Sequence, residues 1–129
     1  MKKNSSPHWK KKSDEHDYPA AANFLTLLME PARAKEVAAC FKNVSITTFQ
    51  VKDLLRASRL PLLPIDNYHV KKDLKKVKQG SLLSPVLLVR GDIEGDRPLI
   101  IADGYHRVCA SYYLDENSEI PCHLVNSVT

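Results

Sequence analysis

The chain has 129 residues, 43% of them hydrophobic and 26% charged, and its formal net charge is +4. This length suits one small domain and excludes two independent cores. No apolar run approaches the roughly 18 residues that a membrane helix needs, and no apolar segment follows the first lysines before Phe24, so we expect a cytoplasmic protein with no membrane partner.

The N-terminal third of the chain predicts a tail followed by two helices. Residues 1–17 carry five lysines among polar residues without periodicity, which is typical of a disordered basic tail. Trp9 can contact a nucleic acid or a partner there, but a mobile segment with one aromatic ring is the simpler interpretation. Pro19 opens a helical stretch and Pro31 can begin another, so residues 18–43 predict a helical hairpin.

Residues 44–129 predict a single domain of the α+β class. The expected elements are a strand at 44–49, helices at 51–58 and 70–78, strands at 82–90 and 99–102, a helix at 104–114 and a strand at 120–125. The nearly continuous apolar run at 82–90 is typical of a central strand. The short charged turn after it predicts a hairpin with the strand at 99–102.

Charge is unevenly distributed along this domain. Residues 44–90 carry nine Lys or Arg against three Asp or Glu, whereas residues 91–129 carry two against seven. The basic stretch at 52–90 can attract DNA or a phosphorylated ligand. Its lysines are also what the solvated face of an amphipathic helix looks like, and this second interpretation is the stronger one.

The three cysteines, Cys40, Cys109 and Cys122, form no CxxC pair and indicate reduced thiols. A metal cluster of Cys109 and Cys122 with His106 and His123 is conceivable. Packing as small hydrophobic side chains is the usual role of free cysteines, so we expect no metal site.

The turn after the strand at 99–102 carries the chemistry. Gly104, Tyr105, His106 and Arg107 occupy the first turn of a helix, where free amides and the positive end of the helix dipole bind phosphate. Arg107 can add a bidentate contact. Between residues 91 and 129 the only other Lys or Arg is Arg97, so we expect Arg107 to serve binding with little effect on stability.

Two residues of this turn are candidates for acid–base catalysis, and each has an alternative. His106 titrates near neutrality and can act as an acid or a base, or it can be an exposed polar residue. Asp103 can take a proton from a hydroxyl group or hold Mg²⁺. It can equally be the N-cap of the helix, accepting hydrogen bonds from the amides of Tyr105 and His106.

The segments Leu83-Ser84-Pro85-Val86-Leu87-Leu88-Val89, Leu99 to Arg107, and Ile120 to Val125 together resemble the ParB/sulfiredoxin domain. The resemblance covers about residues 46–125 and implies a small mixed sheet with packed helices, here in a small stand-alone bacterial member. In chromosome-partitioning members the corresponding turn binds the phosphates of CTP. Gly104, Arg107 and Ala110 match that turn.

Other members of the family suggest further chemistry. The turn of sulfiredoxins has a reactive Cys followed by His and Arg; His106 and Arg107 match, but Tyr105 replaces the Cys, so the chain is not expected to be a sulfiredoxin. The family also includes an ADP-dependent serine kinase, which brings phosphoryl transfer within its range. Asn67, before the helix at 70–78, lies where members place further phosphate contacts, although a turn-forming Asn explains it equally well.

The sequence therefore predicts a domain that binds a nucleotide or a phosphate-bearing small molecule. The expected binding residues are Asn67, Gly104, Tyr105, His106 and Arg107, and the expected catalytic residues are Asp103 and His106. ATP, ADP or CTP with Mg²⁺ are the expected cofactors of a phosphoryl transfer or a nucleotide hydrolysis. The alternative is a non-enzymatic module that binds DNA or a protein through residues 52–90.

Overall fold

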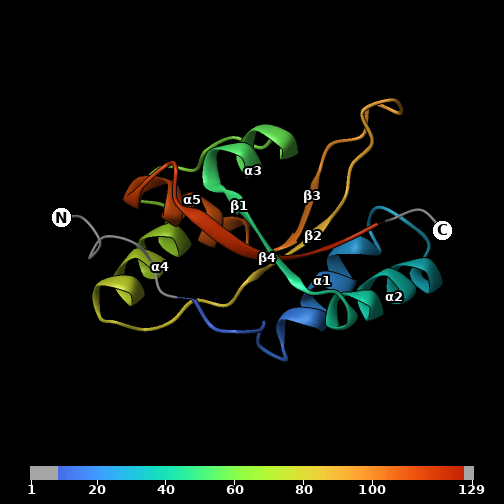
Figure 1. Cartoon of the computed structure of the whole chain (residues 1–129), viewed down its shortest axis with the longest axis horizontal. Helices are drawn as coiled ribbons and strands as arrows, with labels where there is room; N and C mark the ends of the chain where they lie inside the picture. Colours follow the sequence, from blue (N-terminus) through green and yellow to red (C-terminus); the bar gives the residue numbers. More distant parts are fainter. Residues whose placement is uncertain (1–8, 127–129) are drawn as a thin grey trace.

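Four strands form one mixed sheet in the computed structural model, which describes residues 9–126 (Figure 1). Across the sheet the order is β1 (Ile46–Gln50), β4 (Glu119–Val125), β2 (Val86–Val89) and β3 (Ile100–Asp103). β4 pairs antiparallel with β1 and parallel with β2, and β2 pairs antiparallel with β3. The predicted α+β class, the central position of β2 and the β2–β3 hairpin are confirmed.

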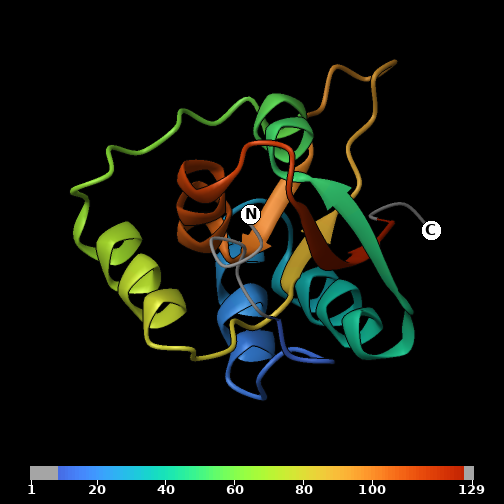
Figure 2. The same cartoon turned by 60° about the vertical axis from the view of Figure 1, so that its left-hand side comes forward.

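Five α-helices and one short 3₁₀ helix complete the described chain. They are α1 (Asp17–Leu25), α2 (Pro31–Cys40), η2 (Phe41–Asn43), α3 (Val51–Ser58), α4 (Tyr68–Lys78) and α5 (Tyr105–Leu114). Figure 2 shows α1 and α2 on one side of the sheet and α3, α4 and α5 on the other. None of the helices in the described residues is long and apolar enough to cross a membrane.

The sheet is buried on both faces because each face has its own apolar core. Val86 and Leu88 of β2 pack under α3, α4 and α5, whereas Leu87 and Val89 pack against α1 and α2. Side chains that alternate between two buried faces need an unbroken apolar run. This explains the composition of β2, and it means that the helical hairpin at 18–43 shares a core with the strands.

The prediction of a disordered tail at residues 1–17 is wrong for residues 9–17, which the structure describes. Residues 1–8 lie outside the described residues, but residues 9–17 run along the segment that precedes β2. The amide of Lys10 donates to the carbonyl of Leu83 (2.8 Å), and Ser13 Oγ donates to the carbonyl of Pro85 (2.9 Å). Asp17 is 3% exposed. Polar contacts and the packing of Trp9 on the core hold this segment, so the interpretation of Trp9 as part of a mobile segment is also wrong.

Candidate anion-binding site

The first turn of α5 starts directly from the end of β3. Gly104 is the N-cap residue with φ +110°, and no side chain caps the helix. A Cβ atom at Gly104 would lie 2.4 Å from Val86 Cγ1, so the close approach of helix and strand needs glycine here. The interpretation of Asp103 as N-cap is wrong, because Asp103 belongs to β3 and its carboxylate binds Arg107 instead.

A polar cavity of about 210 Å³ lies between this turn and α4. It is lined by Asp103, Gly104, His106 and Arg107 and, from α4, by His69, Lys72, Asp73 and Lys76. Four of the residues expected at the site are thus brought together. The α4 residues were not expected, although their spacing of three and four residues places them on one helix face.

Asn67 and Tyr105 are not among the residues that line the cavity. The side chain of Asn67 accepts hydrogen bonds from the amides of His69 (3.0 Å) and Val70 (3.1 Å), which makes it the N-cap of α4. The Tyr105 hydroxyl donates to the carbonyl of Pro61. Both side chains therefore position the segment around α4, and the turn-forming interpretation of Asn67 is confirmed.

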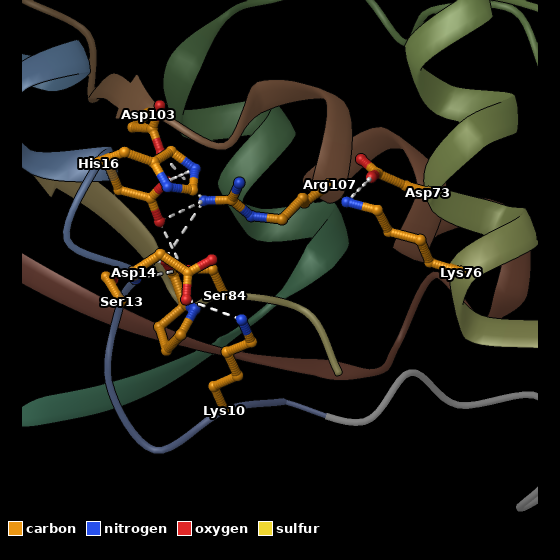
Figure 3. A network of polar contacts seen from close by, with 11 residues as sticks. Lys10, Ser13, Asp14, His16, Asp73, Lys76, Ser84, Asp103 and Arg107 are labelled. Carbon is orange, nitrogen blue, oxygen red and sulfur yellow. Dashed lines mark hydrogen bonds and ion pairs between the residues drawn. The ribbon is translucent and has the colours of Figure 1, made fainter. Parts of the chain in front are cut away.

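Arg107 is not the isolated cation that its sequence context suggested. Its Nη2 atom lies 3.1 Å from Asp103 Oδ2 (Figure 3). The same atom lies 3.7 Å from Asp17 Oδ2 and 3.3 Å from the carbonyl of Pro85. Its side chain is 17% exposed. Asp17 in turn accepts a hydrogen bond from Ser84 Oγ. The arginine therefore joins the helix turn to the N-terminal segment as well as lining the cavity.

Burial shifts the pKa values of the titratable groups in the cavity. It raises the pKa of Asp73 and of Asp103, against the opposing effect of nearby cations. It lowers the pKa of His106, whose ring centroid lies 4.6 Å from that of His69. A histidine with a lowered pKa is neutral at pH 7 and can accept a proton.

The described residues do not assemble the metal cluster considered from the sequence. Cys109 and Cys122 are buried in the core under α5, and burial raises the pKa of Cys122 to about 12. Within residues 9–126, Asp14, His16 and Asp17 bring potential ligand atoms within 4.8 Å of one another. The guanidinium of Arg107 next to Asp17 disfavours a metal ion there.

A larger cavity of about 470 Å³ lies between α3 and the loop that joins β2 to β3. Its floor includes Leu54, Leu88 and Leu124, and its rim carries arginines that pair with aspartates, such as Arg97 with Asp92. None of the expected site residues lines it. The smaller, polar cavity is the one at which four of the expected site residues meet the charged side chains of α4.

No family model, curated protein or solved structure matches the chain. The resemblance to the ParB/sulfiredoxin domain therefore stays a prediction from the quoted segments.

Proposed function

We propose that the protein binds the phosphate group of a small molecule or nucleotide in the cavity between α4 and α5. The observation that carries this proposal is the convergence of Lys72, Lys76 and Arg107 with an uncapped helix N-terminus on one polar cavity. Free amides and cationic side chains are the groups that bind phosphate oxygens in proteins. The mixed sheet, with a helix that starts at Gly104 directly after β3, also supports a ParB/sulfiredoxin-like fold.

The size of the cavity limits what it can enclose. At about 210 Å³ it is smaller than the roughly 300–1,000 Å³ typical of sites for drug-sized ligands. It suits a phosphate group with a few further atoms. The base and sugar of ATP, ADP or CTP would extend beyond it, over the exposed side chains of α4.

If the bound phosphate reacts, His106 fits the role of base better than Asp103. Neutral His106 has a free nitrogen for a proton, whereas the Asp103 carboxylate is already bound to Arg107 at 3.1 Å. The same arginine makes Asp103 a poor ligand for Mg²⁺, because a second cation would be repelled. Phosphoryl transfer and nucleotide hydrolysis thus remain predictions in which His106 is the proton acceptor.

A matched pair of lysine variants tests the proposal. Both Lys71 and Lys72 are exposed, but only Lys72 lines the cavity. In titrations of inorganic phosphate followed by NMR, Lys72→Gln should weaken binding about tenfold, which corresponds to about 1.4 kcal/mol. Lys71→Gln removes the same charge and should change the affinity little. Equal losses in both variants, or no binding by the unmodified protein, would exclude this site.

DNA binding through residues 52–90 is the alternative, and the ion pairs of α3 reduce its support. Arg56 pairs with Asp53 at 3.1 Å and Arg59 pairs with Asp96 at 2.8 Å, which leaves α4 as the main basic surface of this stretch. Binding of duplex DNA should then weaken steeply between 50 and 200 mM salt. Absence of binding at low salt removes this alternative.

A further inference from the structure

The cavity that faces an incoming anion also contains carboxylates. Asp73 lines it with a side chain that is 13% exposed. Its one ion pair among residues 9–126 is with Lys76, at 4.0 Å, and Figure 3 shows the two side chains on α4 beside Arg107. Asp103, by contrast, is bound to Arg107 at 3.1 Å. Asp73 is therefore the carboxylate with the greater remaining capacity to accept a hydrogen bond.

A carboxylate beside these cations can distinguish anions of similar size and charge by whether they carry a hydrogen. An ionised carboxylate can only accept hydrogen bonds. It repels an oxyanion without a hydrogen, but it forms a charge-assisted hydrogen bond with one that carries a proton. Lys76 and Arg107 are cations near Asp73, and with Lys72 on the cavity wall they provide the attraction for the remaining oxygens.

We propose that the cavity selects an oxyanion that carries its own proton, namely hydrogen phosphate, and that the Asp73 carboxylate accepts the hydrogen bond from it. This inference rests on the proposed anion site, but among the ligands proposed for it the inference disfavours nucleotides and phosphate monoesters and favours inorganic phosphate at neutral pH. Sulfate and the dianion of a phosphate monoester have no such hydrogen, because the second pKa of a monoester is near 6. Both are therefore disfavoured by Asp73.

The test compares three dianions at pH 8 and constant ionic strength. Phosphate, sulfate and methyl phosphate then carry nearly the same charge, but only phosphate retains a hydrogen. Burial raises the pKa of Asp73 above the ordinary carboxyl value of 3.8, and pH 8 is chosen to favour the ionised carboxylate. We expect NMR titrations of the full chain to give phosphate about a tenfold or greater preference over the other two, as a charge-assisted hydrogen bond would provide.

Two variants test whether Asp73 causes the preference for phosphate over sulfate and methyl phosphate. Asp73→Asn replaces the carboxylate with an amide that can donate to any oxyanion, so sulfate binding should strengthen and the preference should fall to about twofold or less. Asp66→Asn, at an exposed position outside the cavity, makes the same change of charge and should keep the full preference. Amide NMR spectra of both variants show whether the fold is retained.

The outcomes separate the two proposals. Equal affinity for phosphate and sulfate, or a preference that persists in Asp73→Asn, overturns the selection by Asp73 while leaving the anion site in place. Binding of none of the three anions overturns the anion site and the selection together. A preference that disappears in both Asp73→Asn and Asp66→Asn overturns the specific role of Asp73, because general charge would then explain it.

Discussion

Arg107 combines a structural role with a place at the cavity wall. Its guanidinium lies between Asp103 and Asp17, two carboxylates that are mostly buried and would otherwise repel each other. The contact with Asp17 reaches across more than eighty residues of sequence. An argument from the charges between residues 91 and 129 could not include it, and this is why Arg107 looked isolated.

Replacement of Arg107 should therefore cost stability, contrary to the expectation from the sequence. Arg107→Ala leaves both carboxylates without their cation, and we expect the free energy of unfolding to fall by about 2–4 kcal/mol in urea denaturation. Arg97→Ala is the control, because Arg97 is 69% exposed and its pair with Asp92 should contribute less than about 1 kcal/mol. Equal effects of the two substitutions would contradict a structural role for Arg107.

At the scale of elements, Ser84 attaches residues 9–17 to the segment that precedes β2. The Ser84 hydroxyl donates to Asp17 and accepts from the amide of Asp14 at 2.9 Å, and Ser84 is 5% exposed. The Ser84 side chain therefore provides hydrogen-bond partners for two groups of the N-terminal segment. The segment in turn holds Asp17 beside Arg107 and so supports the wall of the cavity.

Loss of the Ser84 hydroxyl should loosen this segment. We expect Ser84→Ala to lower the free energy of unfolding by about 1–3 kcal/mol, because the Asp17 carboxylate loses a buried donor. Trypsin should then cleave faster at Lys10, Lys11 or Lys12, as measured by mass spectrometry under native conditions. Ser81→Ala, at an exposed position, is the control. Unchanged cleavage in Ser84→Ala would show that other contacts hold the segment.

Elements defined by local patterns were predicted well. The helix at 51–58 has the bounds of α3, and Pro31 is the first residue of α2, as the restricted backbone of proline favours. The predicted strand at 82–90 is too long, because β2 covers only Val86–Val89 and residues 83–85 contact residues 9–14 instead of a strand. The strand propensity of a segment favours an extended backbone, but it does not identify the segment with which that backbone pairs.

In the candidate site too, the sequence could group the residues that are close together in the chain but not those that tertiary packing brings in. Asp103, Gly104, His106 and Arg107 are consecutive or nearly so, and the sequence could therefore group them. The contribution of α4 depends on how two helices pack, which a single sequence does not specify. The sequence predicts a solvated face for the lysines of α4, and all five are exposed, but Lys72 and Lys76 also border the cavity.

At the scale of the whole molecule, one sheet joins two apolar cores. Leu87 and Leu88 are neighbours in β2, yet each is buried in a different core, at 0% and 1% exposure. A disturbance of either core must therefore displace the same strand. The helical hairpin, the sheet and the N-terminal segment should unfold together.

The single tryptophan of the chain offers a direct measurement of this cooperativity. Trp9 packs on the core under α3, α4 and α5, so its fluorescence reports on the N-terminal segment, whereas far-ultraviolet circular dichroism reports on all helices and strands. We expect the two urea transitions to have the same midpoint, as in two-state unfolding. A fluorescence midpoint lower by more than about 0.5 M would mean that the segment detaches before the sheet unfolds.

The position of β4 in the sheet constrains how the protein can be made. Its neighbours β1 and β2 are synthesised earlier, but neither can complete its pairing until residues 119–125 have left the ribosome. During translation β1 therefore has no partner strand for about seventy residues of chain growth, and the apolar run of β2 can form only its hairpin with β3. Exposed strand edges of nascent chains are the surfaces that chaperones protect from aggregation. Folding of this sheet thus waits for the synthesis of residues 119–125, and the yield of folded protein should depend on how long the earlier part of the nascent chain is shielded.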